Sequence, residues 1–248
     1  MLDDVARRLA AAGCVAPEEE ARELVRAAPD DATLAESIRR RESGEPLAWI
    51  TGTMRFCGSS LRVDRGVYVP RPQSEELARR AASLLPEGGR LADLCTGCGA
   101  IALAVGEMRT SARVVAGDID PGAVACARKN GVHAIRMDLG DALRPNSFDG
   151  VTSVAPYVPT PELRLLPSDV VRYEPIRALD GGEDGLLVLR RVVASAARIL
   201  KRGGSLLTEI GGSQDEVLRP VLLGSGFDDV ETWCDDAGDL RGIAARLG

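Results

Sequence analysis

The sequence predicts an α/β fold in which a parallel β-sheet is covered by helices on both faces. From residue 90 onward, apolar strand-like runs alternate with helical segments, a pattern typical of β-α-β units. A glycine-rich turn directly after the first of these strands supports the same fold. The expected strands are 90–94, 112–118, 132–136, 148–154, 204–210, 226–234 and 241–246, and the expected helices are 99–109, 121–130, 184–201 and 214–224. Ligands of such sheets bind at the carboxyl ends of the strands.

Length and composition indicate an ordinary globular protein. The chain has 248 residues, of which 45% are hydrophobic and 27% charged, which suits one main domain with a small appendage. A net charge of -6 gives no general attraction to phosphate backbones, so a nucleic-acid partner is disfavoured. No stretch approaches the roughly 18 apolar residues of a membrane span, and the first residues do not resemble a signal peptide. We therefore expect a cytoplasmic protein without a membrane partner.

Three regions are expected along the chain. Residues 1–43 read as a helical domain, because apolar residues recur there at helical spacing. Residues 44–72 read as a linker that contains a β-hairpin, with strands at 54–57 and 61–63. Residues 73–248 form the main α/β domain.

A ligand-binding loop is expected where the first strand of the main domain ends. Gly97 and Gly99 let the backbone turn sharply and approach a ligand closely. Asp118 ends the next strand, where a carboxylate can accept hydrogen bonds from a ribose diol. Together these features suggest an adenosine site.

Asp93 distinguishes between two ligands that share this glycine pattern. Gly97, Gly99 and Ala102 also fit the dinucleotide fingerprint, in which a pyrophosphate binds at the helix N-terminus. Asp93 stands just before the turn and would repel a pyrophosphate, whereas it suits the cationic ammonium and sulfonium of S-adenosylmethionine (SAM). We therefore predict a SAM-dependent methyltransferase rather than a nicotinamide oxidoreductase.

Other residues at the strand ends each have two interpretations. Asp138 can accept a hydrogen bond from the adenine amino group or cap its own loop. Pro156 and Tyr157 follow the fourth strand and can line a pocket beside the methyl donor, or Tyr157 can fill core space. Arg71 can contact the ligand or form a salt bridge between the helical region and the sheet. The single histidine, His133, argues against a multi-histidine metal site, so no metal is expected.

Seven stretches between Gly44 and residue 241 match motifs of a known family. They are Gly44-Glu45-Pro46-Leu47-Ala48-Trp49-Ile50, Val69-Pro70-Arg71-Pro72, 93–102, Pro156-Tyr157, 174–186, Glu209-Ile210-Gly211 and 236–241. The chain thereby resembles the glutamine side-chain amide methyltransferases that modify peptide release factors. The resemblance implies a SAM-dependent methyltransferase fold with a seven-stranded, mostly parallel sheet in residues 73–248, preceded by a helical substrate-binding domain. It also implies SAM as the cofactor and a release-factor-like protein as the partner.

The residues after the fourth strand depart from the pattern of this family. The family has Asn-Pro-Pro-Tyr there, and its asparagine holds the substrate glutamine amide, whereas this chain has Val154-Ala155-Pro156-Tyr157. An amide nitrogen is a poor nucleophile that needs a hydrogen-bond acceptor in the transition state, and valine has none. Three hypotheses stay open: a protein glutamine as acceptor, a small molecule with an amine or hydroxyl, and a SAM-binding protein without turnover.

The predicted site residues follow from the motifs and the resemblance together. The catalytic residues are predicted to be Val154, Ala155, Pro156 and Tyr157, and SAM is predicted to contact Arg71, Asp93, Cys95, Thr96, Gly97, Gly99, Asp118, Ile119, Asp138 and Leu139. Glu174, Asp180 and Glu209 either shape the acceptor region or satisfy buried backbone amides.

Overall fold

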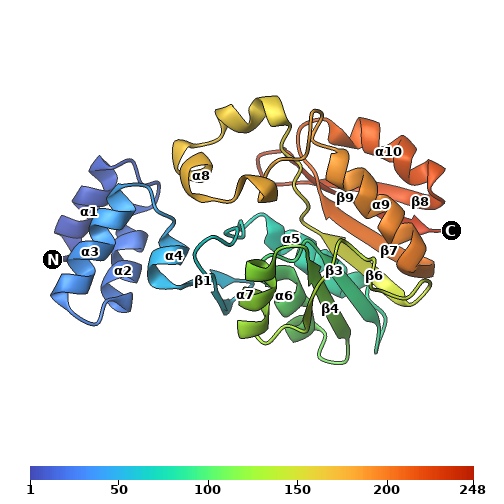
Figure 1. The fold of residues 1–248 in the computed structure, drawn as a ribbon, viewed down its shortest axis with the longest axis horizontal. Helices are drawn as coiled ribbons and strands as arrows, with labels where there is room; N and C mark the ends of the chain where they lie inside the picture. The colour runs from blue at the N-terminus through green and yellow to red at the C-terminus, as the bar shows by residue number, and fades with distance from the viewer.

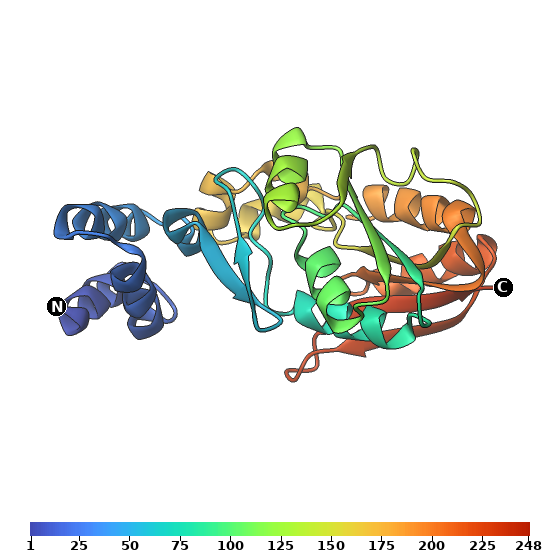
Figure 2. The ribbon, with the colours of Figure 1, turned by 90° about the horizontal axis from the view of Figure 1, so that it is seen from below.

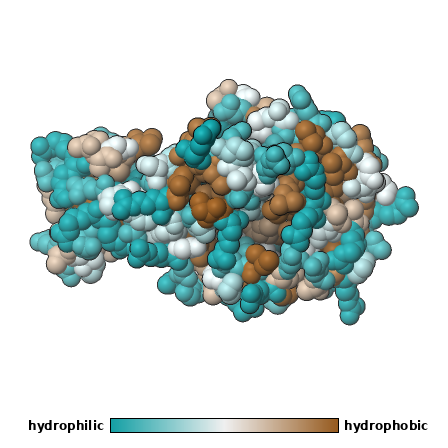
Figure 3. Space-filling model, turned by 45° about the horizontal axis from the view of Figure 1, so that its top comes forward, coloured by the Kyte–Doolittle hydropathy of each residue, from teal (hydrophilic) through white to brown (hydrophobic).

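A computed structural model describes residues 1–248. A small helical domain lies beside a larger α/β domain, and the segment between them includes a β-hairpin (Figures 1 and 2). On the face shown in Figure 3, hydrophobic side chains are concentrated on the α/β domain, whereas the helical domain is largely hydrophilic. None of the helices combines the length and the apolar character that crossing a bilayer requires.

The helical domain has a core of its own. Helices α1 (Leu2–Ala11), α2 (Pro17–Ala27) and α3 (Asp31–Glu42) enclose six buried apolar side chains. Pro17 begins α2, a position that suits its fixed φ angle and missing N–H group. The carboxylate of Asp30 caps α3 by accepting a 2.7 Å hydrogen bond from the Thr33 amide.

The short helix α4 (Leu47–Thr51) connects the two cores, and the sequence did not predict it. Leu47 and Ile50 pack against the helical core, whereas Ala48 and Trp49 belong to the core of the α/β domain. The Trp49 indole also donates a 2.9 Å hydrogen bond to the Val67 carbonyl oxygen. One turn of helix therefore fastens both domains to each other.

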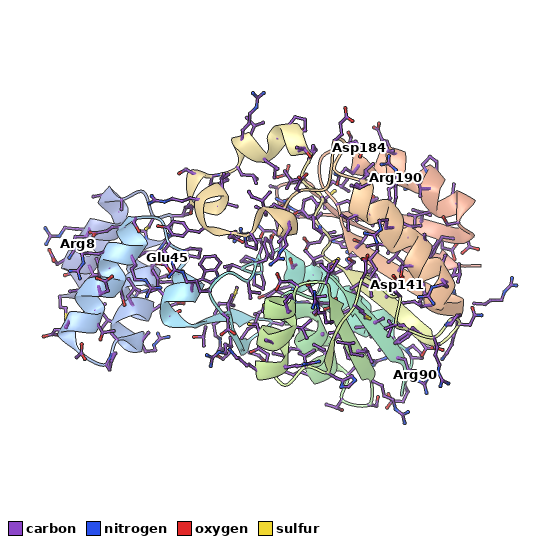
Figure 4. All side chains as sticks on the ribbon, viewed as in Figure 1. Arg8, Glu45, Arg90, Asp141, Asp184 and Arg190 are labelled. Carbon is purple, nitrogen blue, oxygen red and sulfur yellow. The ribbon has the colours of Figure 1, made fainter.

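Glu45 makes an electrostatic contact at the same junction, where Figure 4 labels it. Its side chain is only 5% exposed and pairs with Arg40 of α3 at 2.7 Å and with Arg65 at 3.6 Å. The Arg40 guanidinium holds the pKa of the Glu45 carboxyl below its usual value. The pair therefore anchors the end of α3 to the linker.

The predicted hairpin forms, with a tighter turn than expected. Strands β1 (Thr53–Phe56) and β2 (Ser59–Arg62) pair so closely that Phe56 faces Ser59. The two residues between them, Cys57 and Gly58, have φ angles of 47° and 84°. Two consecutive positive φ values are typical of the two-residue turn that matches strand twist.

Seven strands form one sheet in the α/β domain, as predicted. They are β3 (Arg90–Leu94), β4 (Arg113–Asp118), β5 (Ala134–Arg136), β6 (Phe148–Ser153), β7 (Leu200–Glu209), β8 (Phe227–Cys234) and β9 (Leu240–Leu247), in the spatial order β5-β4-β3-β6-β7-β9-β8. Strands β3 to β7 are mutually parallel, and β9 runs antiparallel to both of its neighbours. The chain order changes direction between β3 and β6, which opens a crevice at their carboxyl ends.

Helices cover both faces of this sheet. On one face, α5 (Ser74–Leu84), α6 (Ala100–Met108) and α7 (Pro121–Lys129) pack over Leu91 and Leu207. On the other face, α9 (Leu187–Ile199) and α10 (Gln214–Gly224) pack over Ala92 and Leu206. Adjacent strand residues thus alternate between the two cores, as the pleat of a strand requires.

The segment between β6 and α9 is the part of the α/β domain that sequence periodicity did not predict. It contains the short helices η1 (Thr160–Leu165), α8 (Ser168–Tyr173) and η2 (Ile176–Ala178). Each comes at or just after a proline, namely Pro161, Pro167 or Pro175. Helices this short give too few repeats for a periodic signal.

Gly185 holds this segment against α10, and its replacement by alanine is expected to destabilise the protein by about 2 kcal/mol or more. Its φ is +73°, and a Cβ there would lie 2.3 Å from the Tyr157 carbonyl oxygen and 2.5 Å from Nε2 of Gln214. Urea denaturation measures the effect. The matched control is Gly106→Ala inside α6, where the nearest atom would be 4.0 Å away and helix propensity predicts a gain of about 0.5 to 1 kcal/mol. Equal stability of both variants would contradict the packing argument.

Candidate active site

A cavity of about 200 Å³ opens in the crevice at the carboxyl ends of β3 to β6. Its walls include Asp93 and Cys95 from the end of β3, Asp118 from β4, Asp138 after β5 and Val154 after β6. Residues from four separate strands converge here because parallel strands end at the same edge of the sheet.

Asp93 is the most unusual group in this cavity. Its carboxylate is fully buried and accepts hydrogen bonds from the Thr96 hydroxyl at 2.5 Å and the Thr152 hydroxyl at 2.8 Å. Burial, with a smaller contribution from the nearby Asp118, raises the pKa of Asp93 to about 6 despite these two donors. No basic side chain pairs with Asp93, so the site favours a cation supplied by a ligand.

The loop after β3 is held in a strained conformation around the cavity. Cys95 has a φ of 57° and Gly97 a φ of 57°, and Leu139 in the facing loop has a φ of 49°. Positive φ values at non-glycine residues are uncommon and gather at ligand sites. Gly99 is the N-cap of α6, and a Cβ there would come within 3.1 Å of Ala127. Gly99 therefore permits close helix packing, although it does not line the cavity itself.

Asp118 organises the neighbouring loop. One of its carboxylate oxygens accepts a 2.9 Å hydrogen bond from the Gly97 amide, and the other accepts a 2.9 Å hydrogen bond from the Asp120 amide. The next residue, Ile119, keeps more than half of its surface exposed while lining the cavity. Asp118 is thus fixed at the mouth of the cavity with remaining lone pairs available for a diol.

Two arginines that the sequence analysis missed pair with acidic side chains of the cavity wall. Arg191 of α9 contacts Asp138 at 2.7 Å, and Arg177 of η2 forms an ion pair with Asp120. Each pair joins segments more than 50 residues apart in the chain. No local motif distinguishes either arginine among the 31 Lys and Arg residues of the chain.

Arg71 lies beside the cavity rather than on its wall. It forms an ion pair with Glu174, whose side chain is 2% exposed, and its guanidinium stacks over the Tyr68 ring at 5.0 Å. Glu174 also accepts a 3.2 Å hydrogen bond from the Val69 amide. Tyr68 does line the cavity, and burial raises the pKa of its hydroxyl. The salt bridge weighed in the sequence analysis is present, and a contact of Arg71 with a ligand stays a prediction.

The four residues after β6 are not all in one place. Val154 and Pro156 line the cavity, whereas Ala155 is buried in the core on the α9 side of the sheet. Tyr157 instead lines a second, neighbouring hollow, and its carbonyl oxygen accepts a 2.8 Å hydrogen bond from Gln214. Burial raises the pKa of the Tyr157 hydroxyl to about 12, so it stays protonated at neutral pH.

The three acidic residues assigned to the acceptor region differ in their hydrogen bonding. Asp180 accepts hydrogen bonds from the Thr160 hydroxyl and the Gly182 amide, and Glu174 is satisfied as described. Glu209 is buried at the end of β7, and its Oε1 atom has no hydrogen-bond partner. Burial raises the pKa of Glu209 to about 7, against the opposing effects of the Ser74 hydroxyl and Arg241.

These features fit SAM chemically. A buried carboxylate without a cationic partner, Asp93, matches the ammonium and sulfonium end of the ligand. The fixed carboxylate of Asp118 and the polar pair Asp138–Arg191 lie further along the wall, where an adenosine would extend. The cavity is therefore suited to one zwitterionic, nucleoside-containing molecule.

Comparison with known proteins also identifies a methyltransferase. No protein family model matches the chain. Over 217 residues the chain is 36% identical to the release factor glutamine methyltransferase of Geobacter sulfurreducens, covering 85% of this chain and 76% of the relative. Over 222 residues it is 38% identical to the protein of the same name from Salmonella typhimurium, covering 86% and 80%. The chain belongs to the release factor glutamine methyltransferase family.

Solved structures agree on the fold of this family member. The Thermus thermophilus 16S rRNA N2 G1207 methyltransferase, solved with SAM and guanosine, aligns with a TM-score of 0.54 at 16% identity over 79% of this chain and 44% of that one. The ribosomal protein L11 methylase of Lactobacillus delbrueckii aligns with a TM-score of 0.53 at 18% identity, covering 76% and 86%. The predicted methyltransferase fold, SAM as the cofactor and the family assignment are confirmed.

Proposed function

We propose that this methyltransferase acts on the side-chain amide of a glutamine in a peptide-chain release factor. The observation that carries the proposal is the match of 34% to 38% identity to relatives that are named for this activity. The Asp93 carboxylate is buried and has no cationic partner within the protein, which adds a physical reason for SAM binding that does not depend on the relatives.

Each group on the cavity wall has a proposed role. Asp93 holds the cationic methionine end of SAM, Asp118 accepts hydrogen bonds from the ribose, and Asp138 binds the adenine amino group. When bound, SAM supplies an electrophilic methyl group on its sulfonium sulfur. Val154 and Pro156 then border the methyl group and guide the acceptor toward it, since alignment of nucleophile and methyl can contribute roughly 7 to 11 kcal/mol.

A small-molecule acceptor is the second candidate, and Val154 is the observation in its favour. Valine offers no hydrogen-bond acceptor to an amide, and an amine needs less assistance. The relatives give no support to this alternative. A protein that binds SAM without turnover is the third candidate, for the same reason.

One labelling experiment separates the three. The purified protein is incubated with SAM carrying a tritiated methyl group and with a bacterial release factor, and the labelled peptide is sequenced by mass spectrometry. We expect label on one glutamine, and a release factor with that glutamine replaced by alanine is the control. Label that enters only small amines or alcohols supports the second candidate. Tight binding of S-adenosylhomocysteine with no transfer to any acceptor supports the third.

A further inference from the structure

Methyl transfer to an amide requires a hydrogen-bond acceptor next to the nitrogen. The nitrogen lone pair is delocalised into the carbonyl, and a proton must leave as the new bond forms. Val154 lines the cavity at the end of β6 and carries no polar side-chain atom. Besides the backbone carbonyls of Val154 and Ala155, a side-chain acceptor for the amide must therefore come from another element.

Glu209 ends the strand beside Val154. Strands β6 and β7 are parallel, with Ser153 opposite Thr208, so Val154 and Glu209 follow as the next pair in register. Paired positions on neighbouring strands face the same side of a sheet. Leu207, two residues before Glu209, packs in the same core as Val154 and α5, which identifies that side. Glu209 thus ends β7 on the side of the sheet that Val154 faces, one layer behind the cavity wall, because Val154 and Ser74 line the cavity and Glu209 does not.

The hydrogen bonding of Glu209 leaves one oxygen free. The residue is 7% exposed, and its Oε1 atom has no partner, although buried polar atoms are nearly always satisfied. The hydroxyl of Ser74, which lines the cavity, opposes the rise in the pKa of Glu209. Arg241 acts on Glu209 only from a distance, because its guanidinium pairs with Asp235 at 2.7 Å. The remaining buried oxygen without a partner, Oγ of Ser153, belongs to a residue that faces the opposite side of the sheet.

We propose, on the basis of the proposed function, that Glu209 accepts the hydrogen bond of the substrate amide N–H and takes up its proton during methyl transfer. The amide nitrogen forms the new N–C bond with the methyl carbon, and the electron pair of the C–S bond goes to sulfur, which leaves as S-adenosylhomocysteine. One N–H proton passes to the Glu209 carboxylate and then to water. The product is a neutral N-methyl amide, and the enzyme returns to its starting charge.

A pH dependence follows from the surroundings of Glu209. The groups that face it are Ser74 from α5, Arg241 from β9, and the hydroxyls of Tyr68 and Tyr157. Burial outweighs Arg241 and raises the pKa of Glu209 to about 7. The carboxylate form therefore increases from about pH 6 to about pH 8, and kcat/KM for the release factor should rise over the same interval.

The test is the variant Glu209→Gln, which keeps the shape and a partner for Ser74 but cannot accept a proton. We expect kcat/KM for the release factor to fall by about 100-fold to 1,000-fold and the rise near pH 7 to disappear. Binding of S-adenosylhomocysteine, measured by calorimetry, should stay within about twofold. The matched control is Glu216→Gln, which replaces an exposed glutamate on α10. It should leave kcat/KM, its pH profile and S-adenosylhomocysteine binding unchanged.

A second variant distinguishes an acceptor from a merely structural residue. Val154→Asn in the Glu209→Gln background places an amide oxygen beside the same position. We expect kcat/KM of this double variant to be at least tenfold higher than that of Glu209→Gln. The rise of kcat/KM near pH 7 should not return, because the amide does not titrate. The inference is overturned if Glu209→Gln keeps the activity and pH profile of the wild type. It is equally overturned if the melting temperature and S-adenosylhomocysteine binding fall together with activity and Val154→Asn restores nothing. A wild-type protein that never labels a release factor contradicts the proposed function instead.

Discussion

Asp93→Asn is expected to weaken SAM binding by about 100-fold while leaving the ligand-free protein at least as stable as the wild type. The loss of affinity follows because a hydrogen-bonded charge contact with the ligand contributes about 1.5 to 3 kcal/mol. The gain in stability follows because the wild-type carboxylate is buried without a cation. Calorimetry measures the affinity, and thermal melting measures the stability.

The sign of the pH effect distinguishes this variant further. The pKa of Asp93 is raised by burial from its usual 3.8 to about 6 in the folded protein, so the native state binds more protons than the unfolded chain between these values. The contribution of Asp93 to stability is therefore present at low pH and is lost as pH rises through about 6, by an amount on the order of 3 kcal/mol. Asp93→Asn should remove this loss. The variant should therefore exceed the wild type in free energy of unfolding by more at pH 7.5 than at pH 4.5.

The control for this experiment is Asp141→Asn, which neutralises an exposed carboxylate (Figure 4). It should change neither the affinity nor the pH dependence. Wild-type affinity in Asp93→Asn would show that the ligand's positive charge is bound elsewhere, and the electrostatic interpretation of the cavity would then be wrong.

Arg71→Met is expected to destabilise the protein by about 3 kcal/mol, at the low end for a buried ion pair because Arg71 keeps 35% of its surface exposed. The variant leaves the Glu174 carboxylate, 2% exposed, with one backbone amide as its partner. Urea denaturation measures the loss. Replacing both partners, in Arg71→Met with Glu174→Gln, removes the buried charge and should recover most of the stability.

The double variant also tests the predicted contact of Arg71 with SAM. If it is stable and binds SAM weakly, Arg71 contacts the ligand in addition to its ion pair; if it binds normally, the role of Arg71 is structural. The matched control is Arg190→Met, whose partner Asp184 is 50% exposed (Figure 4). Exposed pairs contribute little, so less than about 1 kcal/mol is expected. A similar loss in both single variants would contradict the burial argument.

The extent to which the sequence predicted this molecule depends on how local each feature is. The strand, turn and helix around Gly97 and Gly99 are encoded within a dozen residues, and Asp93 stands inside that stretch. Hydrophobic periodicity and the charge of Asp93 were therefore enough to predict this loop and the class of its ligand. Strand β5 is shorter than predicted: it begins at Ala134, whereas the sequence predicted a strand from residue 132. The helices of the segment 160–178 are too short and too often interrupted by proline to leave a periodic signal.

The parts of the site that sequence reasoning missed depend on contacts between distant segments. Arg177 and Arg191 reach the cavity from η2 and α9, which lie more than 50 residues further along the sequence than their partners Asp120 and Asp138. The free oxygen of Glu209 depends on how β6, β7 and α5 pack, and no spacing of residues reports it. Chemical type at one position is visible in a sequence, whereas hydrogen-bond satisfaction is a property of the folded molecule.

The position of Trp49 gives this protein an intrinsic optical probe. The chain has 2 tryptophans, of which Trp233 lies in the outer strand β8 under Arg80. Trp49 sits in α4, and its indole is bonded to Val67, a residue of the cavity wall. In a Trp233→Phe protein all indole emission comes from the junction of the two domains. Fluorescence lifetime and quenching then follow movement of the helical domain and filling of the cavity without an attached dye.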